Sequence, residues 1–206
     1  MPLVAGIRRG VLAFGFVLVC PVAVAAQAGA DSAPSAPYSR LRLRVGAARS
    51  VDHEPVDGYY RAATGGAFGI TTPFYLGWIG ITGTFMPLNA LDHNVAAGRP
   101  NLHMLLLAVD WGVDLPLHGP LRARASADLG DFVMIIENPE TRFDSESELF
   151  TGASLSAGYA LRRDLTVVAS GFLARVHTRP ALNLGIVTLG LEYATRTPRW
   201  LRAILE

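Results

Sequence analysis

The chain has 206 residues, of which 50% are hydrophobic and 17% charged, and its formal net charge is +1. This length fits a single domain, and a charged fraction well below the roughly 25% of soluble domains indicates a chain with much apolar surface. The near-neutral charge argues against a nucleic-acid-binding protein, and the single cysteine, Cys20, excludes an internal disulfide framework.

The N-terminal segment has the pattern of a secretory signal peptide, predicted over residues 1–28. Arg8 and Arg9 precede an apolar run that ends in small residues spaced as Ala-x-Ala. The alternative is a membrane anchor helix, but the run is short for a span of about 20 residues and Pro21 interrupts it. The Ala-, Ser- and Pro-rich residues 29–37 are predicted to be a flexible lead-in.

Segments of alternating apolar and polar residues fill the chain from residue 38 to residue 195. In the first of them, three arginines alternate with Leu41, Leu43 and Val45, so a strand here has one cationic and one aliphatic face. Eight such strands are expected, at 38–48, 58–71, 74–86, 102–115, 120–136, 148–161, 164–177 and 182–195.

The expected connections alternate in length. Those after the first, third and fifth strands are long and polar, whereas those after the second, fourth and sixth are tight turns at Thr72-Pro73, 116–119 and Arg162-Arg163. Long loops at one end and short turns at the other are typical of outer-membrane β-barrels. The sequence therefore predicts an all-β fold, an eight-stranded antiparallel up-and-down transmembrane β-barrel over 38–195.

The polar faces of these strands carry charges of both signs. A closed barrel interior needs such matching, because an unpaired buried charge is costly. A soluble, lipocalin-like carrier with a ligand inside the barrel is the alternative for the same alternation. We expect an ion network inside the barrel, made of Arg40, Arg42, Arg44, Asp110, Asp114, Arg122, Arg124, Asp128 and Glu192.

The layout resembles the eight-stranded outer-membrane barrels of the OmpA and OmpX type. Thr188 to Tyr193 is similar to the polar-x-Gly-x-x-aromatic signal in the last strand of such proteins, although Thr195 stands where an apolar residue is usual. The resemblance implies an outer-membrane location, outer-membrane lipid and lipopolysaccharide as surroundings, and the barrel assembly machinery as partner during biogenesis. It also implies a monomer with a structural or surface-interaction role.

The chain continues past the last expected strand with an amphipathic tail, residues 196–206. Pro198 suits the start of a short helix, and Trp200, Leu201 and Ile204 can share one side of it. Such a helix can lie on the inner leaflet, and the alternatives are a frayed tail or a cap under the barrel.

No pattern in the sequence predicts a catalytic residue, a cofactor or a metal. The five histidines lack metal-ligand spacing, and the acidic segment 137–148 is interpreted as a solvated loop. Outer-membrane lipid A deacylases, also eight-stranded barrels, carry His-x-Ser and a later Glu, which His177 and Glu192 resemble. The serine is missing, and the neighbouring Thr178 would lie on the opposite face, so we predict a protein that is not an enzyme.

Overall fold

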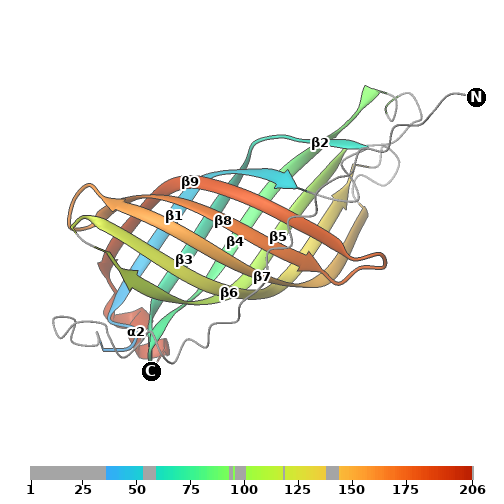
Figure 1. The fold of residues 1–206 in the computed structure, drawn as a ribbon. Coiled ribbons are helices and arrows are strands. Elements are labelled where there is room, and N and C mark those ends of the chain that lie inside the picture. The colour runs from blue at the N-terminus through green and yellow to red at the C-terminus, as the bar shows by residue number, and fades with distance from the viewer. Residues whose placement is uncertain are drawn as a thin grey trace, which may run out of the picture. The chain divides into compact units, whose positions relative to one another are not determined.

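The computed structural model of the chain describes residues 36–52, 59–92, 95, 101–117, 119–137 and 144–205. The predicted signal peptide and most of the predicted lead-in lie outside the described residues. The described part consists mainly of strands, with a helix, α2, at its C-terminal end (Figure 1). These elements are β1 (Arg40–Asp52), β2 (Tyr60–Ala62), β3 (Gly65–Phe74), β4 (Gly77–Ala90), β5 (Leu102–Pro116), β6 (Leu121–Ile136), β7 (Asp144–Ala160), β8 (Leu165–Val176), β9 (Leu182–Arg196) and α2 (Arg199–Leu205).

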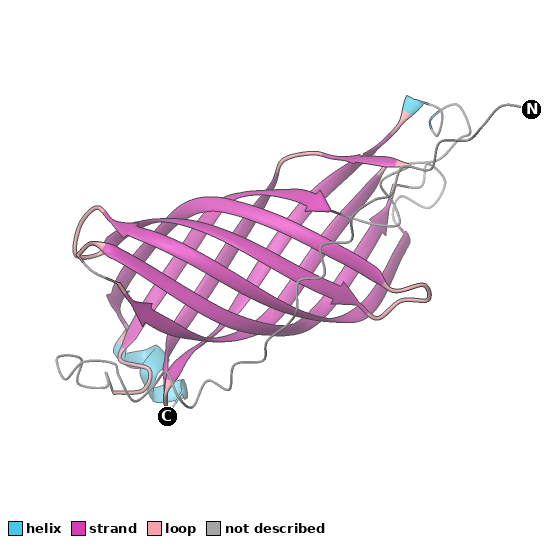
Figure 2. Ribbon diagram, viewed as in Figure 1, coloured by secondary structure: helices cyan, strands magenta, loops and turns pink. Residues whose placement is uncertain are grey.

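The strands form one closed antiparallel barrel (Figure 2). β2 and β3 both pair with β4 and are two parts of one barrel strand, interrupted at Ala63 and Thr64. β1 pairs with both β3 and β9, and β4 pairs with both β3 and β5, so the sheet closes on itself. This arrangement confirms the predicted eight-stranded antiparallel barrel with a short C-terminal helix.

The two ends of the barrel differ. The turn end carries the short connections between β3 and β4, β5 and β6, and β7 and β8, and helix α2 follows β9 there (Figure 1). The loop end carries the connections from β1 to β2, β4 to β5, β6 to β7 and β8 to β9. The longer connections thus share one end, as the sequence predicted.

The predicted turn at Thr72-Pro73 is wrong. Both residues belong to β3, where Pro73 pairs with Trp78, and the turn lies at Tyr75 and Leu76, with Tyr75 at a φ of 46°. The Pro73 carbonyl accepts a hydrogen bond from the Tyr38 N–H, so the backbone polar groups of Pro73 face the β1 side. The ladder between β1 and β3 has already ended there, at Thr71, so the proline removes no ladder hydrogen bond.

Several strands reach further toward the loop end than the sequence predicted. β4 continues to Ala90 and β7 begins at Asp144, inside segments expected to be loops. Leu88 pairs with Leu102 in this extension, and both side chains are buried inside the barrel. The extra ladder is thus stabilised by apolar packing in the interior.

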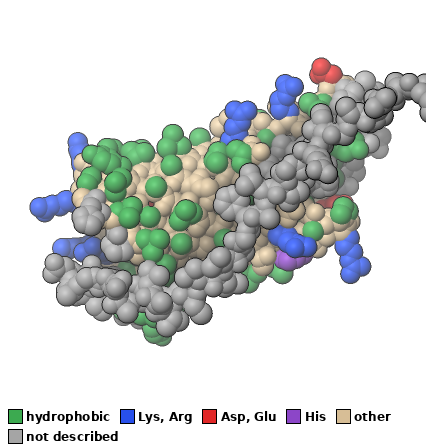
Figure 3. Space-filling view, in the orientation of Figure 1, with side chains coloured by type: hydrophobic (Ala, Val, Ile, Leu, Met, Phe, Trp, Pro, Cys, Tyr) green, Lys and Arg blue, Asp and Glu red, His purple; other side chains and the backbone are tan. Residues whose placement is uncertain are grey.

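The outer surface of the barrel is apolar around its middle. Large aliphatic side chains point outward from every wall of the barrel, and Figure 3 shows hydrophobic side chains spread over the face that it draws. In water this apolar surface would be exposed to solvent, whereas in a bilayer it would be buried against lipid. The most exposed of these side chains are Val45, Ile81, Val109, Leu129, Leu155, Leu173 and Leu189.

Helix α2 begins where the sequence predicted. The Arg202 N–H donates to the Pro198 carbonyl in the first turn of the helix. Just before the helix, the Thr197 N–H donates to the carbonyl of Ser39, the residue that precedes β1. Among the residues that the structure describes, no helix has both the length and the apolar character needed to cross a bilayer.

Candidate functional site in the barrel interior

The interior of the barrel has two layers of different chemistry. The layer toward the loop end is apolar and densely packed, with most of its large side chains less than 3% exposed. The sequence analysis predicted only a charged interior and missed this layer. Its members come from β1, β4, β5, β6, β7, β8 and β9: Ala48, Met86, Leu88, Leu102, Met104, Leu106, Ala108, Phe132, Phe150, Ala174, Val176, Leu182, Leu184 and Ile186.

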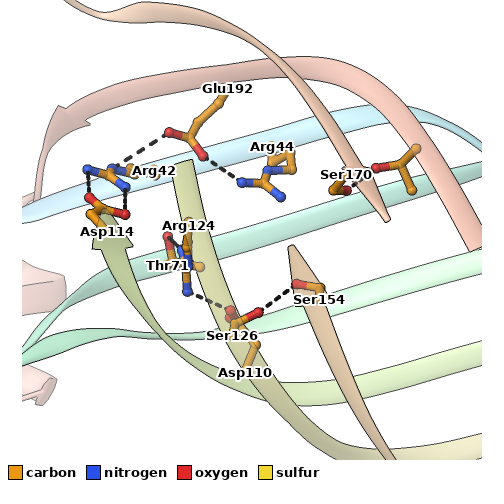
Figure 4. A network of polar contacts seen from close by, with 11 residues as sticks. Arg42, Arg44, Thr71, Asp110, Asp114, Arg124, Ser126, Ser154, Ser170 and Glu192 are labelled. Carbon is orange, nitrogen blue, oxygen red and sulfur yellow. Dashed lines mark hydrogen bonds and ion pairs between the residues drawn. The ribbon is translucent and has the colours of Figure 1, made fainter. Parts of the chain in front are cut away.

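The layer toward the turn end holds charged and hydroxyl side chains (Figure 4). Arg42 on β1 donates two hydrogen bonds to Asp114 on β5, at 3.1 and 2.7 Å. Its Nε lies 3.6 Å from Glu192 on β9, and Arg44 Nη2 lies 3.1 Å from the other oxygen of the same carboxylate. Glu192 thus lies between two arginines of β1, and this pairing spans the lumen from β9 and β1 to β5.

The most deeply buried ion pair joins Arg124 on β6 and Asp110 on β5. Arg124 Nη2 lies 2.5 Å from Asp110 Oδ2, and the two side chains are 8% and 5% exposed. Arg124 Nη1 also donates to the Thr71 hydroxyl of β3 at 3.4 Å. Removing one member of such a pair would leave the charge of the other buried without its partner.

Asp128 is the buried carboxyl with the fewest contacts in this layer. It pairs with Asp110 in the β5–β6 ladder, is 8% exposed, and its Oδ2 has no hydrogen-bond partner among the described residues. It lines a cavity of about 40 Å³ together with Asp110, Arg124 and Glu192. A cavity of this size admits a few water molecules, which can satisfy the open oxygen.

Smaller polar side chains and one aromatic ring complete the layer. Ser126 and Ser154 hydrogen-bond at 2.7 Å between β6 and β7. The Arg42 guanidinium lies 3.5 Å from the centroid of the Trp78 ring, which therefore points into the barrel. This cation–π contact fixes the Trp78 side chain inside the barrel.

Two residues of the expected network lie outside it. Arg40 and Arg122 are exposed, and neither has an ion pair among the described residues. Both have the inward strand parity of Arg42 and Arg124, but Arg40 is the first residue of β1 and Arg122 the second residue of β6. At the rim a long side chain reaches water instead of the lumen, so parity alone does not place it inside.

The two residues that resemble the deacylase pair are far apart. His177 follows β8 at the loop end, is exposed, and contacts the Thr151 hydroxyl at 3.2 Å. Glu192 pairs with Thr166 in the ladder between β8 and β9. Thr166 precedes His177 by eleven residues, so Glu192 and His177 are about 35 Å apart along the strand direction. The Thr178 hydroxyl donates to the Pro180 carbonyl. These residues do not form a catalytic unit.

The described part of the acidic segment joins polar neighbours at the loop end. His103 Nε2 lies 2.8 Å from Glu137 Oε1, and the Asn101 side chain donates to the other oxygen. These hydrogen bonds lower the pKa of the Glu137 carboxyl from its usual value. Within the described ranges, no three His, Cys, Asp or Glu side chains are grouped so as to hold a metal ion.

Several solved structures share this barrel, although no protein-family model and no curated protein sequence matches the chain. Neisserial surface protein A aligns with a TM-score of 0.52 and 11% identity, covering 74% of this chain and 96% of that one. Ail, the attachment invasion locus protein of Yersinia pestis, aligns with a TM-score of 0.51 and 14% identity, covering 76% and 99%.

The outer membrane protein OprG of Pseudomonas aeruginosa aligns with a TM-score of 0.50 and 9% identity, covering 77% of this chain and 97% of that one. At such low sequence identity, the similarity to these structures is one of backbone fold. Together with the closed barrel and its apolar outer band, it confirms the expected resemblance. The chain has the eight-stranded antiparallel β-barrel fold of these outer-membrane proteins.

Proposed function

We propose that the chain is a closed, non-enzymatic barrel of the outer membrane that acts through the surface it presents at its loop end. The observation that carries this proposal is the combination of an apolar outer band with a filled interior. The band suits lipid on all sides of the barrel. The filled interior leaves the ends of the barrel as the surfaces available for a function.

The packing of the described interior side chains supports a barrel that does not conduct solutes. The apolar layer of fourteen buried side chains crosses the lumen at the loop end, and the ion pairs of Arg42, Arg44 and Arg124 cross it at the turn end. An eight-stranded barrel has room for its own side chains and little else. Transport of ions or metabolites is therefore not the function that this interior supports.

The surface role follows from the loop end and from the structural neighbours. The long connections gather at this end, and Ail, one neighbour with the same barrel, is by name an attachment protein. In outer-membrane barrels the long loops face outward and the short turns face the periplasm. Contact with other surfaces through these loops, or support of the envelope by the barrel itself, is the role we propose.

The two competing classes lack support from particular residues. A soluble lipocalin-like carrier would place polar side chains outside and leave an apolar ligand cavity inside. Here Leu155 and Leu189 are more than 60% exposed on the outside, and the apolar interior is packed with side chains. A lipid A-modifying enzyme would need His177 beside an acid and a nucleophile, and Glu192 lies at the other end of the barrel.

The location and orientation can be tested with one epitope tag in two places. We expect the protein in the outer-membrane fraction, with a lower apparent mass on gels before boiling than after. A tag inserted between residues 138 and 143 should react with antibody on intact cells. The same tag between Arg162 and Arg163 should react only after permeabilisation. Recovery as a soluble protein without detergent would reject the proposal.

The absence of lipid-modifying activity can be tested by mass spectrometry of lipid A. Cells that express the protein should contain lipid A of unchanged mass, because His177 and Glu192 are separated by about 35 Å along the strand direction. The His177→Ala variant serves as the matched control. A mass shift that the wild type produces and this variant does not would show that the protein is an enzyme.

A further inference from the structure

The turn end of the barrel carries a concentration of positive charge. Besides Arg202, six arginines are exposed there, at strand ends, in the β7–β8 turn and at the start of α2. Figure 3 shows blue side chains at this end and also toward the loop end. None of the six has an ion pair among the described residues. They are Arg40, Arg122, Arg162, Arg163, Arg196 and Arg199, and we call them the rim arginines.

Acidic residues do not balance the rim arginines. At the turn end, the described acids near the surface are Asp114 and Asp164, and Asp114 is already held by two hydrogen bonds from Arg42. The loop end differs, because its exposed arginines are accompanied by Asp92, Asp131 and Glu146 among other acids. Among the described residues, a surplus of arginines over acids is therefore found at the turn end and not at the loop end.

Exposed apolar side chains lie next to the rim arginines. Trp200 and Ile204 of α2 are 67% and 73% exposed, and their spacing of four residues puts them on one side of the helix. Tyr75 and Leu76 in the β3–β4 turn are 79% and 83% exposed. Aromatic and aliphatic side chains beside arginines are the composition of a protein surface at the headgroup level of a bilayer.

We propose that the rim arginines and α2 form a binding surface for the phosphate groups of anionic phospholipids in the leaflet at the turn end. The inference rests on the membrane location proposed above. A guanidinium binds a phosphate through two parallel hydrogen bonds, and clustered arginines near a membrane surface favour anionic lipid. Trp200 and Ile204 insert among the acyl chains beside these headgroups and hold α2 parallel to the membrane surface.

Native mass spectrometry of the delipidated protein in detergent tests this proposal. Phosphatidylglycerol and phosphatidylcholine of the same chain length are added in equal amounts, and the bound lipids are counted. We expect phosphatidylglycerol to be preferred by about tenfold or more, because each of several arginines contributes to its retention. The preference should fall as salt is added, since exposed charges are screened.

A matched pair of variants assigns the preference to the turn end. The first changes four rim arginines to glutamine: Arg162→Gln, Arg163→Gln, Arg196→Gln and Arg199→Gln. The second makes the same charge change at the loop end: Arg49→Gln, Arg61→Gln, Arg175→Gln and Arg179→Gln. The rim variant should lose most of the preference, whereas the loop-end variant should keep it.

The outcomes separate this inference from the proposed function. Both variants should still shift in apparent mass on boiling, which shows that the barrel is folded. A wild-type protein that is heat-modifiable and located in the outer membrane, but binds both lipids equally, would reject the lipid surface alone. Equal loss in both variants would also reject it. Co-sedimentation with peptidoglycan that depends on the rim arginines, without a lipid preference, would replace it with a cell-wall contact.

Discussion

Arg124→Leu is expected to lower the free energy of unfolding by about 3–5 kcal/mol, because it leaves a buried carboxylate without its partner. Arg124 and Asp110 are 8% and 5% exposed and lie 2.5 Å apart. The described ionisable side chains of the polar layer include three arginines and four carboxyl groups, so the formal charge there is −1. The substitution makes it −2 around Asp110 and Asp128.

Arg122→Leu is the matched control for this change. It stands two residues away on the same strand with the same parity, but its side chain is exposed and has no ion pair among the described residues. Its loss is expected to change the unfolding free energy by no more than about 0.5 kcal/mol. The difference between the two variants therefore measures burial, since the chemical change is identical.

Two further variants test the charge count of the polar layer. Removing both partners, Arg124→Leu with Asp110→Leu, restores the formal charge of −1 and should recover at least about 2 kcal/mol of the loss, since neither member of the pair is left buried without the other. Asp128→Asn removes the carboxylate whose Oδ2 has no partner, and it should leave stability unchanged or raise it.

Urea unfolding of barrels refolded into lipid vesicles measures these differences. Equal midpoints for Arg124→Leu and Arg122→Leu would mean that Arg124 is solvated and that the polar layer is an open aqueous lumen. A strongly destabilised Asp128→Asn would mean that this carboxylate has an essential cationic partner. Either result would contradict the network described here.

The strand alternation was enough to predict the fold and the outward side chains. Leu105, Leu107 and Val109 alternate with residues that point inward, and the structure places these three on the outer face. Such a prediction works because a strand has a side-chain period of two, and because lipid outside and a polar lumen inside give the two faces opposite compositions.

The apolar layer was missed because the same rule fails where the lumen is also apolar. Leu102, Met104 and Leu106 share the inward parity of Asp110, so the first half of β5 is apolar on both faces. The expected strand 74–86 also carries apolar residues at both parities. A closed barrel with an apolar layer inside produces such a pattern.

The contacts within the polar layer could not be predicted, because they depend on the register of the closed barrel. Arg44 pairs with Glu192 in the ladder between β1 and β9, two strands that are far apart in the sequence. Asp114 reaches Arg42 across the lumen from β5, and this contact depends on barrel diameter and strand tilt. The alternation of residues predicts which face of the sheet a side chain occupies. Predicting its contact partner requires the register and geometry of the complete barrel.

Leu155→Arg is expected to lower the free energy of unfolding in lipid vesicles by about 2–4 kcal/mol, the cost of an arginine on the lipid face near the bilayer midplane. Leu155 is 61% exposed on the outer face of β7. Its ladder partner on β8 is Gly171, close to the middle of that twelve-residue strand. The side chain therefore lies far from both ends of the apolar band.

Leu161→Arg is the control for Leu155→Arg, because Leu161 is similarly exposed but lies in the β7–β8 turn beside the rim arginines. At the interface the same substitution should cost about 0–1 kcal/mol, since the guanidinium reaches water and phosphate. The two side chains are similarly exposed on the same chain segment but differ in their depth along the barrel axis. In a soluble barrel both side chains would be in water, so equal urea midpoints for the two variants would reject the membrane location and favour the lipocalin-like alternative.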